Sequence, residues 1–195
     1  MKKNILAALI LLTVAAGFCG CGSTSKQAGV ENYGPLSGAP AWVLSPTVDG
    51  ALAAVGSAKI GGAGINFART EALAVARDEL ARQMSVKVNN MVKNFTETTG
   101  IGDAETVDKV ATQVSKQVAS ETLIGSKQTE TWISPDKELY LLVTLDADTA
   151  QEAVKNAAAT SFKSDQALWQ KFQAQKAQDE LAEAVEKEFG DYKNK

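Results

Sequence analysis

A single apolar stripe in the middle of the chain most constrains how it can fold. Apolar residues recur there every three or four positions, at Leu73, Ala76, Leu80, Met84, Val88, Met91 and Phe95. This spacing keeps them on one face of an α-helix, with most charged residues off that face. The sequence therefore predicts a long helix that is capped by Asn66 and ends at Thr99-Gly100, with Met84 and Met91 in the core.

A strand and a glycine turn are expected immediately before this helix. Residues 51 to 60 are small and apolar around Leu52 and Val55, which is typical of a short buried strand. Gly56 would let a helix approach that strand closely. The run from Gly61 to Gly64 lacks the lysine and hydroxyl residue of a P-loop, so we interpret it as a strand-to-helix turn rather than a phosphate cradle.

A second helix and a β-hairpin are expected after the long helix. Asp103 can cap a helix whose apolar stripe is Val107, Val110, Val114 and Val118. Between Leu123 and Ile133 the side-chain pattern instead repeats every two residues, which predicts a strand. Ser134 to Lys137 is predicted to form a turn. The strand from Glu138 to Asp146 follows, with Leu139, Leu141, Val143 and Leu145 on one face and Tyr140, Leu142 and Thr144 on the other.

The last part of the chain is expected to be helical and poorly buried. Asp148 and Gln151 match a capping box at its start. Between Gln173 and Glu180 the only apolar residues are alanines, before Leu181, Val185 and Phe189. We expect so polar a helix to project from the body or to pair with another chain.

These elements define an α+β fold in the order β-α-α-β-β-α. We expect a small antiparallel β-sheet packed by the long helix, followed by a C-terminal helical extension. The domain boundaries that follow are a signal peptide at residues 1–20, a flexible tether at 21–41, an α+β domain at 42–150 and a C-terminal helical extension at 151–195.

The first residues have the plan of a bacterial lipoprotein signal. Lys2 and Lys3 precede an apolar run that is too short to span a bilayer. Cys21 follows the small Gly20, whereas Cys19 follows the bulky Phe18, so Cys21 is the expected lipidation site. Plain secretion and a retained membrane segment are the alternatives. The aspartate that retains lipoproteins at an inner membrane is absent after the cysteine, which points to lipid anchoring at the outer membrane.

Composition excludes several classes of partner and chemistry. Cleavage removes Lys2 and Lys3 from the 20 basic residues, which leaves 18 against 23 acidic residues and a formal charge of −5. No basic stripe is present, so nucleic acid is not an expected partner. The chain has 0 histidines and would keep one cysteine, which excludes a disulfide within a monomer, Ser/His/Asp or Cys/His catalysis and the usual zinc sites.

Three tryptophans are the remaining candidates for a binding surface. Trp42, Trp132 and Trp169 stand out in a chain with 6% aromatic residues. They either belong to the core or form a stacking surface for a flat ligand or an anchor in a protein interface. We interpret Asp146 and Asp148 as capping residues rather than cation ligands, and Glu130, Asp136 and Glu138 as a solvated face.

Two stretches of the chain resemble the LPP-twenty family of bacterial surface lipoproteins. They are residues 54–58 with the glycine turn and residues 68–82, and Trp132 with the strand around residues 139–143 fits the same pattern. The resemblance covers about residues 40 to 150. It implies a lipid-anchored envelope protein with a dodecin-like body and no catalytic motif. Some members are associated with flagellar outer-membrane structures and motility, and others with host interaction.

The functional hypothesis is a non-enzymatic, lipid-anchored envelope lipoprotein of the outer membrane. It would act as a structural or protein-interaction module, with protein partners or a homo-oligomer and no cofactor. The alternative is a small-molecule-binding envelope protein with a tryptophan-lined or sheet-lined site. A carboxylate-based enzyme acting on the cell wall is a weaker third hypothesis.

Overall fold

The computed structural model describes residues 34–100, 104–164, 169–170, 172–173 and 175–192. The signal peptide, Cys21 and the expected cap Asp103 lie outside this part of the chain. The principal elements are β1 (Ala51–Lys59), α1 (Ile65–Thr99), α2 (Ala104–Gly125), β2 (Lys127–Ile133), β3 (Glu138–Asp146), α3 (Ala147–Lys163) and α5 (Gln175–Phe189). Short 3₁₀ turns are η1 (Gly34–Leu36), η2 (Ala41–Val43) and η3 (Gly190–Tyr192).

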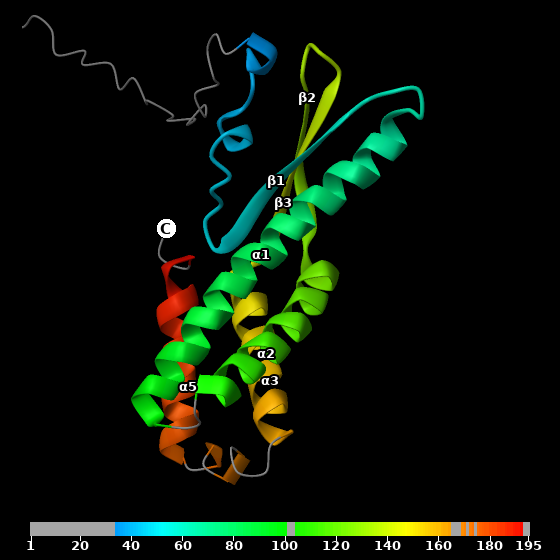
Figure 1. Ribbon diagram of the computed structural model, residues 1–195. Coiled ribbons are helices and arrows are strands. Elements are labelled where there is room, and N and C mark those ends of the chain that lie inside the picture. Colours follow the sequence, from blue (N-terminus) through cyan, green and yellow to red (C-terminus); the bar gives the residue numbers. More distant parts are fainter. Residues whose placement is uncertain (1–33, 101–103, 165–168, 171, 174, 193–195) are drawn as a thin grey trace, which may run out of the picture.

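The molecule is elongated, with a sheet at one end and a helical bundle at the other, and α1 runs through both (Figure 1). Its 35 residues correspond to a length of about 52 Å. The first half of α1 covers one face of the sheet, as expected. The second half packs against α2 and α5, and α3 packs against α2 and α5 in turn. The expected α+β architecture is confirmed.

The sheet is antiparallel and has the strand order β1-β3-β2. Every residue of β1 is paired, from Ala51 with Asp146 to Lys59 with Glu138. The β2–β3 pairing contains a register shift between Gln128 and Glu130. Leu139, Leu141, Val143 and Leu145 face α1, whereas Leu142 and Tyr140 belong to the opposite face, so the predicted alternation is confirmed.

Small residues bring β1 and α1 into close contact. Ala68, Ala72 and Ala76 are fully buried at successive turns of α1, and Gly56 lies opposite them. A Cβ atom at Gly56 would overlap the carbonyl oxygen of Ala72 and would lie 2.6 Å from the amide nitrogen of Ala76. The expectation that Gly56 admits a helix is therefore confirmed, and the glycine is sterically required.

The starts of α1 and α3 are displaced from their predicted positions. Gly64, with φ +83°, occupies the N-cap of α1, and no side chain caps this end of the helix. Asn66 is not the cap, because it already lies inside the first turn. Asp146, not Asp148, caps α3, and its Oδ1 accepts a hydrogen bond from the Thr149 amide at 3.1 Å. Gln151 donates to Glu186 Oε2 on α5 instead of closing a capping box.

Two further expectations about the helices are wrong. Leu123 to Gly125 belong to α2, so the second strand begins at Lys127. The C-terminal helix does not project: Leu181, Val185 and Phe189 of α5 are buried against α1 and α3. Their spacing of four residues makes a narrow apolar stripe. That stripe is enough to bury one face of α5, because the other helices of the same chain already form the rest of the bundle.

The C-terminal end of α5 is also tied to the long helix. Lys87 Nζ donates to the carbonyl oxygen of Glu188 at 2.6 Å and lies over the rings of Phe189 and Tyr192. The amide of Gly50, just before β1, donates to the Tyr192 carbonyl oxygen at 2.7 Å. The last described residues thus contact both α1 and the entry to the sheet.

Candidate interaction site at the edge of the sheet

The face of the sheet opposite α1 carries an aromatic cluster. Trp42 is 5% exposed and packs with Ala39, Val43, Ala53 and Leu142, while Trp132 and Tyr140 pack against this cluster at its border. The Trp132 and Tyr140 rings are 5.3 Å apart and tilted by 44°. Ala39 lies in the stretch expected as tether, yet it is fully buried here. The cluster therefore closes this face with side chains of the chain itself.

Trp169 lies far from the other two tryptophans, in the bundle. Its ring is 5.6 Å from that of Phe172, and Lys163 Nζ lies 5.1 Å above it. Phe172 in turn stacks on Phe162. The structure thus brings Trp42 and Trp132 into one cluster and leaves Trp169 in another, so the three do not share a surface.

Tyr140 is a titratable group whose surroundings raise its pKa. Burial raises the pKa of the Tyr140 hydroxyl, and the neighbouring carboxylates of Glu138 and Asp136 raise it further. Glu138 Oε1 also accepts a hydrogen bond from Ser57 Oγ at 2.7 Å. Glu138 was expected to belong to a solvated face together with Glu130 and Asp136. Its carboxylate is instead held within the sheet by this hydrogen bond.

One edge of the sheet is formed by β1 and is only partly covered. In an antiparallel pair, successive residues direct their backbone groups alternately toward and away from the partner. The carbonyl of Gly50 and the amide of Ile60 bond on the β3 side, so the odd-numbered residues face the free edge. The Ala51 amide donates there to Val48, and the Ala53 carbonyl accepts from Gln83 Nε2 at 3.4 Å.

Beyond Ala53 the edge is open. The backbone N–H and C=O groups of Val55, Ser57 and Lys59 on this side have no hydrogen-bond partner among the described residues. Such a row of unpaired groups is a template for strand addition. It is the feature that sequence reasoning missed, because the residues of a strand do not tell whether it lies in the middle or at the edge of its sheet.

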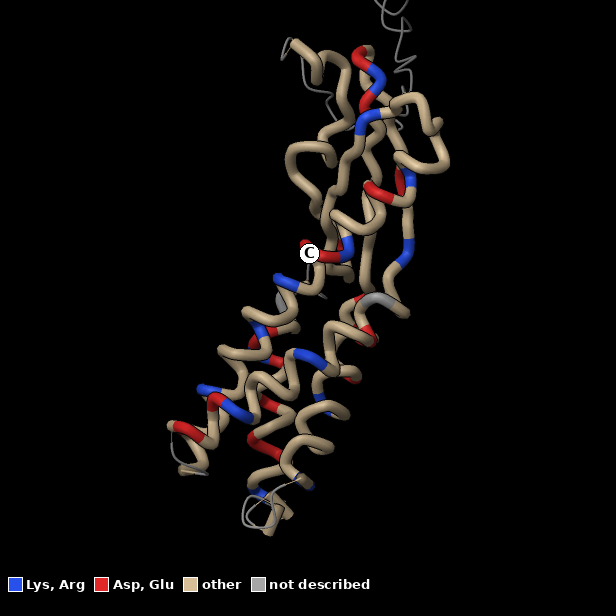
Figure 2. Tube along the Cα trace, turned by 45° about the vertical axis from the view of Figure 1, so that its right-hand side comes forward, with Lys and Arg blue, Asp and Glu red and all other residues tan. Residues whose placement is uncertain are grey.

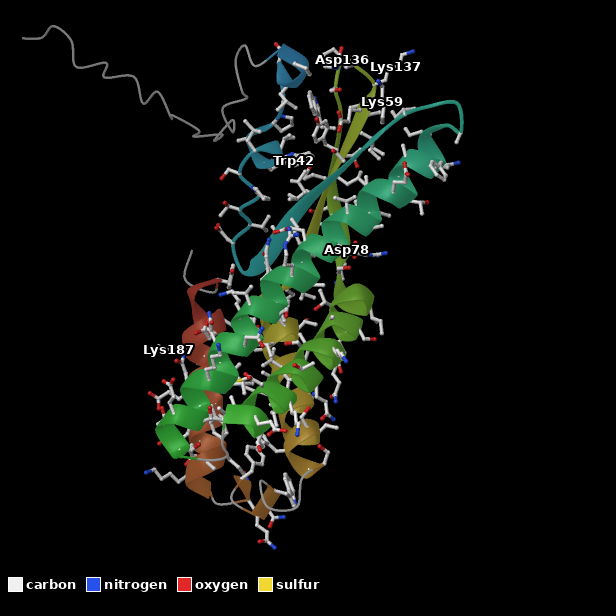
Figure 3. The ribbon with its side chains drawn as sticks, in the orientation of Figure 1. Trp42, Lys59, Asp78, Asp136, Lys137 and Lys187 are labelled. Atoms are coloured by element: carbon white, nitrogen blue, oxygen red, sulfur yellow. The ribbon has the colours of Figure 1, made fainter. Side chains whose placement is uncertain are left out.

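A hollow of about 440 Å³ runs beside this open edge. Its floor is Ala54 and Val55, one wall is Val43 and Pro46, and the other wall is α1 at Val75, Asp78, Glu79, Arg82 and Gln83. Figure 3 shows Trp42 and Asp78 on either side of β1. Val75 is 50% exposed, and Leu44, next to Val43, is 52% exposed. On the α1 side the open edge is therefore flanked by the exposed apolar side chain of Val75.

The charges around the hollow are only partly paired. Glu79 and Arg82 form an ion pair with each other. Asp78 makes no ion pair or hydrogen bond with the described part of the chain. Figure 2 shows basic and acidic residues interspersed over both halves of the molecule. The surface thus offers local charges rather than a field of one sign.

The described residues were also compared with the requirements for a metal site and for a membrane-spanning helix. Among the described residues no group of three His, Cys, Asp or Glu side chains is arranged to hold a metal ion. None of the helices described has the length and apolar character needed to cross a bilayer.

Comparison with known proteins identifies a family. The family model described as LPP20 lipoprotein matches residues 40–146, which covers more than half of the chain and includes the whole sheet, α1 and α2. No curated protein and no solved structure matches significantly.

Proposed function

The chain belongs to the LPP20 lipoprotein family, and on this premise we propose that it is a non-enzymatic lipoprotein of the outer membrane that serves as a structural or protein-interaction module. The signal sequence with Cys21 and Gly22 supports the anchor and its destination. The resemblance first seen at residues 54–58 and 68–82 maps onto β1 and α1, which form the floor and one wall of the hollow.

The observation that carries the interaction role is the open edge of β1 at Val55, Ser57 and Lys59. A free edge beside exposed Val75 provides both backbone hydrogen bonds and apolar contacts for a protein partner. The C-terminal helices do not supply such a surface, since the apolar residues of α5 are buried within its own bundle.

A tryptophan-lined ligand site receives no support of this kind. Trp42 is packed by its own chain, and the hollow beside it is lined by no tryptophan. A partner that binds along the strand edge accounts for the geometry better than a small molecule does.

Photo-crosslinking in intact cells tests the interaction role. A photoreactive amino acid replaces Leu44, Val75, Val86 or Ile124, which are exposed apolar positions, and Lys155 on α3 serves as an exposed polar control. We expect discrete protein adducts at Leu44 and Val75 and none at Lys155. Absence of a protein adduct at all four apolar positions would contradict the proposal.

A further inference from the structure

We propose that the sheet end of the molecule makes a second contact with the phospholipid bilayer that holds the lipid anchor. The contact is made by a tip, which consists of the start of α1, the β1–α1 turn at residues 61–64 and the β2–β3 turn at residues 134–137. This inference rests on the proposed lipid anchor and adds how the anchored body stands on the membrane. The exposed apolar side chains of the tip are Ile65, Phe67 and Ile133.

The elements of the tip meet at one end of the molecule. In Figure 1 the β2–β3 turn, the β1–α1 turn and the blue turn η1 all lie at the end opposite the helical bundle. The amide of Ile60 donates to the carbonyl oxygen of Lys137 at 2.8 Å, which joins the end of β1 to the β2–β3 turn. Figure 3 shows Lys59, Asp136 and Lys137 at this same end. The tip is therefore one surface built from three parts of the chain.

Ile65 and Phe67 lie on different sides of α1, so a surface contacts both only if it meets the helix end-on. They are the first and third residues of α1 and are 48% and 55% exposed. Residues two apart are separated by about 200° around the axis of an α-helix. Their Cα–Cβ bonds also tilt toward the N-terminus of the helix, which is at the tip. A partner lying along the side of α1 would reach one of the two, whereas a flat surface at its end reaches both.

Two lysines at the tip suit a layer of phosphate headgroups. Lys59 and Lys137 are exposed, and neither makes an ion pair within the described part of the chain. Lys137 has φ +60°, a left-handed backbone conformation that glycine adopts with less strain. Lysine side chains can extend to the phosphates while neighbouring apolar side chains enter the bilayer. Asp136 and Glu138 offset the two positive charges, so the apolar side chains must supply most of the contact.

The expected lipid tether leads to the same end of the molecule. The described chain begins at Gly34 in η1, and Leu36 of η1 packs against the aromatic cluster of the sheet. About 13 residues separate Cys21 from Gly34 and can span at most about 45 Å. The tether thus keeps the tip close to the bilayer at a high effective concentration, so a contact too weak to hold a free protein can persist. This proximity favours lipid over a protein as the occupant of the tip.

Quenching by labelled lipids tests the contact on the full lipid-anchored protein. With the lipid on Cys21 the mature chain has no free thiol, so Phe67→Cys and Ile133→Cys can each be labelled with a bimane fluorophore. The protein is reconstituted into vesicles of phosphatidylethanolamine and phosphatidylglycerol that carry a nitroxide-labelled lipid. We expect both tip probes to lose more than half of their emission. The exposed apolar controls, Val86→Cys on α1 and Ile124→Cys on α2, should lose less than a tenth.

Charged substitutions at the tip provide a second test. With the probe at Ile65→Cys, replacing both Phe67 and Ile133 by Asp should lower the quenching several-fold, whereas Val86→Asp should leave it unchanged. Each of these side chains is exposed, and thermal unfolding checks that the variants stay folded.

The possible outcomes separate the contact from the anchor. Equal quenching at tip and control positions, or none at the tip while the protein stays on the vesicles, would overturn the contact and leave the anchor intact. Loss of the protein from the vesicles would contradict the anchor and the contact with it. A photoreactive residue at Phe67 that captures a protein instead of a lipid in intact cells would also overturn the contact, because the tip would then be a protein interface.

Discussion

Gly56 of β1 lies directly against Ala72 of α1, with no room for a side chain between the two backbones. We predict that Gly56→Ala lowers the free energy of unfolding by about 1–3 kcal/mol or more, because either the strand or the helix must move to relieve the overlap. Chemical denaturation measures this change. Gly62→Ala is the control: a Cβ atom there meets nothing within 4 Å, so a comparable loss in both variants would contradict the close-packing argument.

Lys87 links α1 to the end of α5. Lys87→Met should lower the free energy of unfolding by about 1–2 kcal/mol, because it removes a charge at a helix C-terminus and two cation–π contacts. Thermal unfolding and protease cleavage after α5 would report the change. Lys93→Met, at an exposed position of the same helix, should leave both unchanged.

The cap of α3 can be tested by comparing two aspartates. Asp146→Ala should cost about 1 kcal/mol, because the Thr149 amide loses its acceptor at 3.1 Å. Asp148→Ala removes a charge from the first turn of the helix but not the cap, and should cost less. Equal losses in denaturant unfolding would contradict the assignment of Asp146 as the cap.

Tyr140 should contribute a pH dependence on the alkaline side. Since its pKa is raised in the folded state above 10.0, the neutral hydroxyl is favoured by folding, and this contribution is complete below pH 10. It is lost as the pH rises through the folded pKa, because the unfolded chain then ionises first. Tyr140→Phe should remove this part of the fall in unfolding free energy above about pH 10. An identical pH profile for the wild type and the variant would contradict it.

Lipidation can be tested with the two cysteines of the signal region. Cys21→Ser should release the protein from the membrane fraction, whereas Cys19→Ser should leave it membrane-bound. Cell fractionation with immunoblotting measures both. If only Cys19→Ser releases the protein, the lipid anchor is on Cys19 and the assignment to Cys21 is wrong.

Periodicity predicted the regular elements of the fold. The stripe from Leu73 to Phe95, the valines of α2 and the two faces of β3 were all correct, because a helix or strand buries residues at its own period whatever it packs against. The caps of α1 and α3 were each displaced by two residues. For α3 the reason is that Asp146 and Asp148 have the same chemistry and differ only in backbone conformation.

Long-range packing could not be predicted from the same patterns. Leu181, Val185 and Phe189 form a stripe that is typical of both a projecting helix and a bundle helix, and only contact with α1 and α3 decides between them. The same limit applies to the position of β1 at the edge of the sheet, which depends on how distant segments meet. It also applies to the packing of Trp42 with Trp132 and not with Trp169.

The central claim is that the β1 edge is covered when the protein is in the envelope. Amide hydrogen exchange of the β1 peptide, compared between isolated outer membranes and detergent-released monomer, tests it most directly. We predict that the amides of Val55, Ser57 and Lys59 exchange at least tenfold more slowly in the membranes, while the central strand β3 is equally protected in both. Equally fast exchange of the edge amides in both samples would contradict the account.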